Sequence, residues 1–97
     1  MLRLIDSTSE PAYAVPFLVD RSNAPSFKLV NVGREPVRAI TLTLLGSGVM
    51  LANIPNRLLP GEALDFTLVG DDLAKATVLV VRWFRHSGEQ YLWRVSF

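Results

Sequence analysis

The chain has 97 residues, of which 49% are hydrophobic, with ten basic and nine acidic side chains and no cysteine. This apolar content excludes intrinsic disorder, and the length suits a single domain spanning residues 1–97. Without cysteine there can be no disulfide framework, thiolate zinc site or cysteine nucleophile. A net charge of +1 is too small to indicate nucleic-acid binding, and we expect none.

The N-terminal sequence lacks the features of a secretory signal. Residues 1–6 carry no apolar stretch of the required length followed by a small-residue cleavage site. The longest apolar runs, such as residues 78–81, are far shorter than the ~20 residues that cross a bilayer, so we expect no membrane span. We therefore expect a cytoplasmic protein if the chain is full-length, and the compartment stays open if it was excised from a larger one.

The first half of the chain alternates apolar and polar residues in short segments, which is typical of antiparallel strands. Residues 1–25 are expected to form an N-terminal strand and loop segment. Within it, residues 12–19 are an edge-strand candidate, because Pro16 cannot donate to a sheet. Residues 27–32 and 37–45 are predicted strands. The second of these is expected to place Ile40, Leu42 and Leu44 on one face, with Arg38 among them at the solvent-proximal end.

Turn residues divide the second half of the chain. Leu59-Pro60-Gly61-Glu62 predicts a type II turn, since proline presets the second position and glycine supplies a positive φ at the third. A half-buried strand with Leu64, Phe66 and Leu68 on its buried face follows, ended by Gly70. Residues 71–76 then predict one helical turn with Asp71 as N-cap.

The last 21 residues predict a β-hairpin. Residues 77–85 and 89–97 flank a three-residue loop, and Gly88 stands where such a loop needs a left-handed residue. The resulting register sets Trp83 opposite Tyr91 and gives one wholly apolar face, whereas a one-residue slip would place an arginine in that face. We expect four of the hairpin's five aromatic residues inside the core: Trp83, Tyr91, Trp93 and Phe97.

The other face of this hairpin mixes apolar residues with arginines. Either another segment such as residues 12–19 covers this face, or it is a contact surface. Apolar residues broken by arginines are typical of protein interfaces. The candidate interaction face consists of Val78, Val80, Arg82, Phe84, Leu92 and Arg94.

Two of the turn motifs resemble those of bacterial immunoglobulin-like domains of the CARDB type. Phe27-Lys28-Leu29-Val30-Asn31-Val32-Gly33 is similar to the family's strand ending in Asn-x-Gly, and Leu59-Pro60-Gly61-Glu62 is similar to its turn before a strand. The resemblance covers roughly residues 26–97. It implies a small accessory or adhesion sandwich without catalysis, and it implies no functional residue.

The sequence contains no recognised catalytic or metal-binding motif. The single histidine, His86, lies beside Ser87 at the hairpin tip, where it cannot bridge a hydroxyl and a carboxylate. The acidic residues Glu62, Asp65, Asp71 and Asp72 lack the spacing of a calcium loop. Gly46-Ser47-Gly48 lacks the Lys and helix of a phosphate loop and is interpreted as a strand connection.

These patterns predict an all-β, immunoglobulin-like antiparallel sandwich of six to eight strands. We expect no catalytic residue, cofactor or metal, and a non-enzymatic interaction or structural accessory module. Its partner is expected to be a protein with acidic groups, or a second copy in a weak homodimer. The alternative is a carbohydrate-binding module that uses Trp83, Tyr91 or Trp93. An arginine stripe for nucleic acid (Arg34, Arg38, Arg82, Arg85 and Arg94) is disfavoured by the neutral charge balance.

Overall fold

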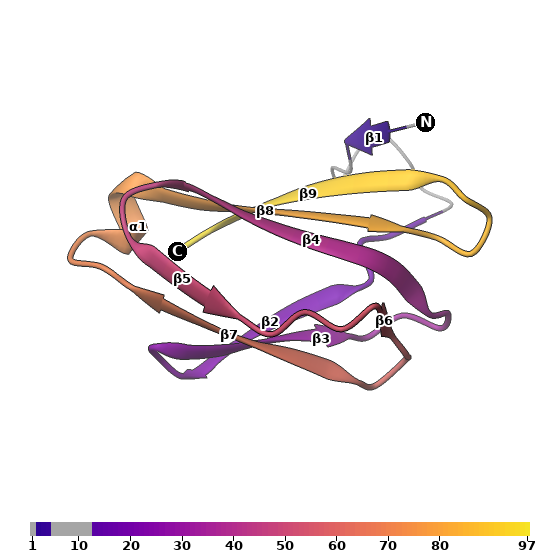
Figure 1. Ribbon diagram of the computed structural model, residues 1–97, viewed down its shortest axis with the longest axis horizontal. Helices are drawn as coiled ribbons and strands as arrows, with labels where there is room; N and C mark the ends of the chain where they lie inside the picture. Colours follow the sequence, from indigo (N-terminus) through magenta and orange to yellow (C-terminus); the bar gives the residue numbers. More distant parts are fainter. Residues whose placement is uncertain (1, 5–12) are drawn as a thin grey trace.

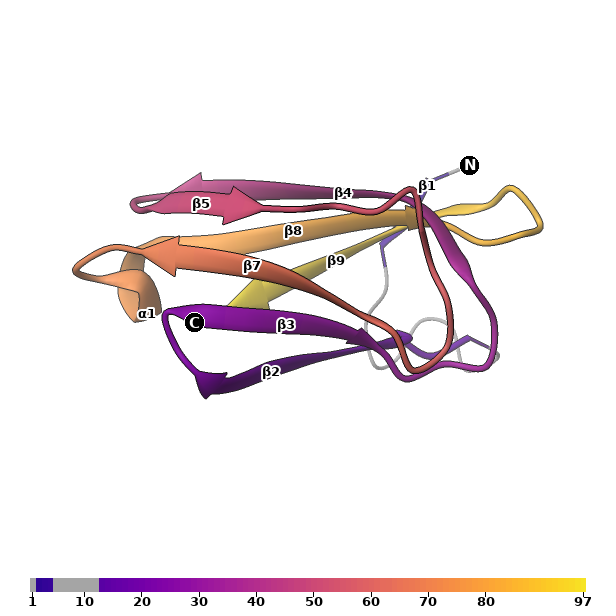
Figure 2. The same ribbon diagram turned by 60° about the horizontal axis from the view of Figure 1, so that its bottom comes forward.

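Two β-sheets lie face to face in the computed structural model, which describes residues 2–4 and 13–97 (Figures 1 and 2). One sheet has the strand order β1-β9-β8-β4-β6 and the other β2-β3-β7-β5. The elements are β1 Leu2–Leu4, β2 Phe17–Asn23, β3 Ser26–Asn31, β4 Val37–Gly46, β5 Val49–Ala52, β6 Arg57–Leu58, β7 Ala63–Val69, α1 Leu73–Ala76, β8 Thr77–Phe84 and β9 Gln90–Ser96.

The strand order identifies the fold class. β2, β3, β7 and β5 follow the order of the four-stranded sheet of an immunoglobulin constant-type sandwich, and β9, β8 and β4 follow that of its three-stranded sheet. The predicted all-β immunoglobulin-like sandwich is therefore confirmed. The range of six to eight strands covers the seven longer ones, and the short strands β1 and β6 bring the described total to nine.

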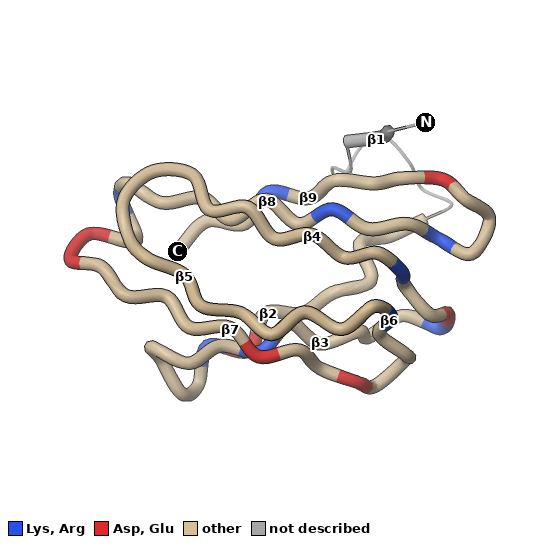
Figure 3. Tube along the Cα trace, viewed as in Figure 1, with Lys and Arg blue, Asp and Glu red and all other residues tan. Residues whose placement is uncertain are grey.

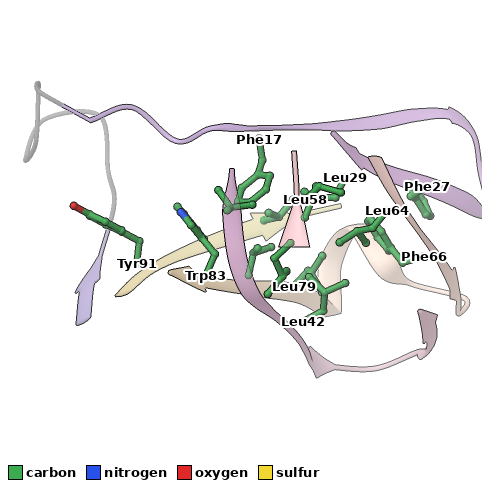
Figure 4. Close-up of a cluster of buried hydrophobic side chains, with 14 of the residues drawn as sticks. Phe17, Phe27, Leu29, Leu42, Leu58, Leu64, Phe66, Leu79, Trp83 and Tyr91 are labelled. Carbon is green, nitrogen blue, oxygen red and sulfur yellow. The ribbon is translucent and has the colours of Figure 1, made fainter. Parts of the chain in front are cut away.

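The core lies between the inward faces of the two sheets. Figure 4 shows Phe17, Leu29 and Phe66 from one sheet meeting Leu79 and Trp83 from the other. Inward and outward residues alternate along the strands, as burial of a single face requires. The largest side chains in the core with essentially no exposure are Trp83, Tyr91 and Phe66.

The predicted hairpin register is confirmed. Trp83 pairs with Tyr91 and Val81 with Trp93 between β8 and β9. The loop closes through a hydrogen bond from Gly88 N to the carbonyl oxygen of Arg85 at 2.9 Å, with Gly88 at a φ of +93°. A positive φ at this position favours glycine, which explains how the sequence marks the turn.

Two other local predictions were wrong in detail. The edge strand expected at residues 12–19 begins only at Phe17 and runs on to Asn23, because Pro16 precedes the ladder instead of joining it. Residue 12 lies outside the described part of the chain. The N-cap of α1 is Asp72, not Asp71, and its backbone carbonyl, not its side chain, accepts hydrogen bonds from Lys75 and Ala76.

The two turn motifs found in the sequence meet at Asn31. The Pro-Gly turn forms as predicted: Glu62 N donates to the carbonyl oxygen of Leu59 at 3.0 Å, and Gly61 has a φ of +84°. Gly61 N donates to the backbone oxygen of Asn31 at 2.7 Å, and Asn31 N donates to the backbone oxygen of Glu62 at 2.9 Å. The two motifs therefore form one hydrogen-bonded corner of the sandwich.

The buried Asn31 side chain extends this corner to two further segments. Its Nδ2 donates to the carbonyl oxygens of Glu35 and Leu58, both at 3.0 Å. Its Oδ1 accepts a hydrogen bond from Gly33 N at 2.9 Å. Because backbone groups in a sandwich interior need hydrogen-bond partners, these three bonds help to fix the course of the β3–β4 loop and the position of β6.

The helical content of the described residues is confined to α1, which has four residues. Within residues 2–4 and 13–97, no helix has the length and apolarity that a bilayer crossing requires.

Candidate functional site

The structure brings the predicted interaction face together on the outward side of β8 and β9. Val80 pairs with Arg94, and Arg82 pairs with Leu92. Directly paired residues of an antiparallel ladder share one face, so these four side chains form a continuous surface. Val78 and Phe84 lie on the same face toward the two ends of β8 and are partly buried.

A shallow hollow of about 340 Å³ lies at the centre of this face. We call it the arginine groove. Val80 points outward but is only 8% exposed, because outward side chains of the neighbouring strands surround it. It forms the apolar floor of the groove. The residues that line the groove are Thr43, Leu45, Val80, Arg82, Leu92 and Arg94.

The sequence pattern missed the contribution of β4 to this groove. Thr43 pairs with Val80 and Leu45 pairs with Val78, so the outward positions of β4 form one wall. Alternation along residues 37–45 does place Thr43 and Leu45 on the same face of the strand. It cannot show that this strand lies next to β8, which is a contact between distant parts of the sequence.

Arg38 was expected at the solvent-proximal end of the face that carries Ile40, Leu42 and Leu44. It is exposed as expected, but it lies on the opposite face of the strand. The register between β4 and β8 shifts between Arg38 and Thr41, and Ala39 has a positive φ of +49°. Such a bulge inserts an extra residue and changes the side on which the following alternation continues. Arg38 consequently points outward together with Thr41, and its pairing partner on β6 is Arg57.

The two outer faces of the sandwich differ in charge. The outward positions of β4, β6, β8 and β9 include four arginines and no acidic residue: Arg38, Arg57, Arg82 and Arg94. On the outer face of the other sheet, Lys28 lies between Asp20 and Asp65 and binds Asp65 at 2.7 Å. Figure 3 shows blue segments along β4, β8 and β9 and a red one on β7.

The arginines of the groove have no acidic partner within the described part of the chain. Neither Arg82 nor Arg94 forms an ion pair or a side-chain hydrogen bond there, and both are exposed. Arg85, by contrast, is held by Glu35. The guanidinium groups of the groove are therefore available to an external acceptor.

Residues 12–19 were expected as one possible cover for this face, and the described part of that segment lies elsewhere. Tyr13, Val15 and Val19 pack against the core. Phe17 begins β2 in the opposite sheet. The outward face of β8 and β9 is thus not covered by residues 13–19.

A separate polar cluster closes one end of the sandwich. Arg85 Nε donates to Glu35 Oε1 at 2.6 Å, and Arg85 Nη2 donates to Glu35 Oε2 at 3.2 Å. The same guanidinium lies 4.0 Å above the centre of the Tyr13 ring. Trp83 Nε1 donates to the Tyr13 hydroxyl at 3.0 Å, so the cluster attaches residue 13 to the core. The cluster therefore joins Glu35 of the β3–β4 loop and Tyr13 to the closing hairpin.

The ion pair at this end is expected to make stability depend on pH. The Arg85 hydrogen bonds lower the pKa of Glu35 below its ordinary value of 4.5. The stabilisation is therefore present above that value and is lost as the pH falls through the lower folded-state pKa. We expect Glu35→Gln to reduce the free energy of unfolding by about 1–3 kcal/mol at pH 7, and by less at pH 3. Urea denaturation at both pH values measures this difference.

Asp65→Asn is the matched control for this prediction, because it removes a carboxylate from an ion pair on the open surface. Asp65 has 73% of its side chain exposed, so its pair with Lys28 is screened by solvent. We expect little change in stability at either pH. A Glu35→Gln loss that is the same at pH 7 and pH 3 would contradict the role given to the ion pair.

Aromatic residues of the hairpin occupy the positions predicted for them. Trp83 and Tyr91 have 0% and 1% exposure, and the ring of Tyr91 contacts that of Tyr13 in a tilted arrangement with ring centres 4.7 Å apart. Trp93 and Phe97 are partly buried against the core. Carbohydrate binding by this hairpin stays a prediction. Among the three residues named for it, only Trp93 has surface that a sugar ring could contact.

The remaining polar candidates are dispersed over the molecule. His86 is exposed at the hairpin tip, with Nδ1 3.5 Å from Glu35 Oε2. Over residues 2–4 and 13–97, no three His, Asp or Glu side chains gather as a metal site would require. Gly46-Ser47-Gly48 connects β4 to β5, as the sequence indicated.

Comparisons with family models, with curated proteins and with solved structures find no match to this chain.

Proposed function

We propose that this protein is a non-enzymatic interaction module that binds an acidic, partly apolar segment of another protein in the arginine groove. The observation that carries this proposal is an apolar floor bounded by arginines that have no acidic partner in the described chain. An accessory role of the kind found in CARDB-type domains is compatible with it.

The composition of the groove supports a protein ligand. Val80 and Leu92 offer apolar contact area, which favours association by removing that area from water. Arg82 and Arg94 lie diagonally across the β8–β9 ladder, so two carboxylates on either side of an apolar side chain would meet both guanidinium groups. Arginine beside apolar residues is the composition that protein interfaces favour.

A partner of different sequence is favoured over a second copy at this groove. In a two-fold contact the same patch faces itself, so Arg82 and Arg94 of both copies would come together. The outward positions of these strands carry no acidic residue that could accept them. Like charges directly opposite each other oppose association, whereas an acidic partner would be attracted.

Selection from a displayed library of random 12-residue peptides tests this proposal. We expect the wild-type protein to enrich peptides that carry two or more acidic residues around an apolar one. Arg82→Glu/Arg94→Glu should weaken the binding of these peptides at least tenfold. Affinity should also fall as salt rises, because the contacts are exposed charges.

Arg34→Glu/Lys75→Glu is the matched control, because it makes the same change in net charge at exposed positions away from the groove. It should retain wild-type affinity to within about threefold, since the remaining effect is long-range and screened. Enrichment of peptides that bind both double variants equally would contradict the proposal. Tight binding of a random single-stranded DNA that Arg82→Glu/Arg94→Glu abolishes, without acidic peptides being enriched, would replace it with nucleic-acid binding.

A further inference from the structure

The edge strand β5 carries a strip of exposed apolar side chains. Val49 and Leu51 point outward with 64% and 70% exposure. Val69 on the neighbouring strand β7 is 58% exposed and pairs with Val49. Met50 points the other way and packs against the core. The strip therefore lies on the outer face of its sheet, directly at the open edge.

This edge differs from the other sheet edges in the described structure. β2 carries Asp20 and Arg21, with a register shift between Asp20 and Asn23. β9 is paired by β1 at residues 90–92 and carries Arg94 further along. The edge at β4 is paired at its start by β6, bears Arg38 and Arg57, and contains the bulge. Charges, bulges and covering strands are the devices that keep sheet edges from pairing with other chains.

β5 has none of these devices. Its four residues are uncharged and include no proline, and all four pair with β7 without a register shift. It lies at the end of the strand order β2-β3-β7-β5, so its second side bears no strand within the described residues. Backbone groups along that side can accept another strand of the same length.

We propose that β5 pairs antiparallel with β5 of a second copy, joining the two four-stranded sheets into one. Antiparallel pairing of a strand with itself obeys two-fold symmetry, so one surface serves both partners. Residues directly opposite each other must share a face, so one residue lies opposite itself in the second copy. The registers that keep the most pairs within β5 set Met50 opposite Met50 or Leu51 opposite Leu51. The Met50 register sets Val49 opposite Leu51 of the second copy and brings the exposed apolar side chains together.

The Leu51 register is less favourable because it would set Val49 opposite the polar Asn53 of the second copy. No charged residue lies at residues 48–53, so no like-charge repulsion opposes the pairing. A four-residue strand buries less than the ~1,600 Å² of a standard interface, and the dimer is therefore weak. It forms at high micromolar concentration.

The dimer would place both arginine grooves on the same side. The two-fold axis of such a continuous sheet runs perpendicular to it, so it leaves the outer face of each β4–β8–β9 sheet pointing in one direction. A partner with two acidic segments could then bind both grooves, and the second contact would benefit from a raised effective concentration. This consequence depends on the proposed function, whereas the dimer itself does not.

Sedimentation equilibrium from about 10 µM to about 1 mM tests the proposal, because weak interfaces associate within this range. The mean mass of the wild type should rise toward that of a dimer. Leu51→Lys should stay monomeric over the range, because it adds a charge at the centre of the edge. Leu18→Lys is the matched control: it makes the same charge change at an exposed leucine of β2 and should associate like the wild type.

Denaturation curves of both variants must match the wild type, as expected for substitutions at exposed positions. A wild type that remains monomeric up to about 1 mM, where even weak interfaces associate, would overturn the proposal. Association of Leu51→Lys at wild-type strength would also overturn it. If Phe84→Asp abolished the dimer and Leu51→Lys did not, the contact would lie on the arginine-bearing face instead.

Discussion

Asn31→Asp is expected to lower the free energy of unfolding by about 3–5 kcal/mol, a large part of the stability of a small domain. The side chain is fully buried, and its Nδ2 donates to the carbonyl oxygens of Glu35 and Leu58. A carboxylate in the same place has no hydrogen to donate and would face two carbonyl oxygens. It would remove both of these hydrogen bonds and bury a charge.

Chemical denaturation at pH 7 measures this loss, with Asn53→Asp as the matched control. Asn53 is exposed, and only its backbone N–H bonds to the described chain, through the carbonyl oxygen of Asp65. We expect the control to remain close to the wild type. At pH 3, where an aspartate is protonated and can donate one hydrogen bond, the loss in Asn31→Asp should shrink. Equal stability of both variants at pH 7 would show that Asn31 does not hold the corner together.

Gly46→Ala is the second substitution with a large expected effect, about 3 kcal/mol or more. Gly46 lies at the end of β4 with a φ of +93°, a conformation that L side chains rarely adopt. A Cβ atom there would also lie 1.7 Å from the carbonyl oxygen of Ala76. The backbone of the α1–β8 junction would have to move to admit it.

Gly61→Ala separates the two causes, because Gly61 has a similar φ of +84° and open space where its Cβ would be. Its free energy of unfolding should fall only by the cost of placing alanine in a left-handed conformation, about 1–2 kcal/mol. Thermal and urea denaturation of the two variants gives the comparison. If both lose the same amount, the close approach of Ala76 does not constrain the β4–β5 connection.

Local signals in the sequence predicted the fold where neighbouring residues determine the structure. The hairpin register followed from the spacing of apolar residues around Gly88, and the type II turn followed from Pro60 and Gly61. The bulge at Ala39 left no such signal, because alanine has no preference for a positive φ. The motif around Asn31 was visible as a turn. Its bonds to β6 were not, since they join residues far apart in the chain.

The candidate site likewise has residues that local sequence patterns predict and residues that they do not. All six residues of the predicted face lie together. Period-two alternation predicts which residues of a strand share a face, and this does not depend on which strands lie beside it. Thr43, Leu45 and the outward-pointing Arg38 depend on which strand lies beside β8 and on the bulge. β5 was too short to show alternation, so its exposed edge became apparent only from the sheet order.

Binding of an acidic segment to the outer face of β4, β8 and β9 is the function proposed for this protein. Amide chemical-shift mapping of the wild-type protein, titrated with an acidic peptide enriched in the selection, tests it most directly. We expect the largest shifts at Thr43, Val80 and Leu92, with little change along β2 and β3. Shifts centred on β2 and β3, with the amides that line the arginine groove unchanged, would contradict the claim.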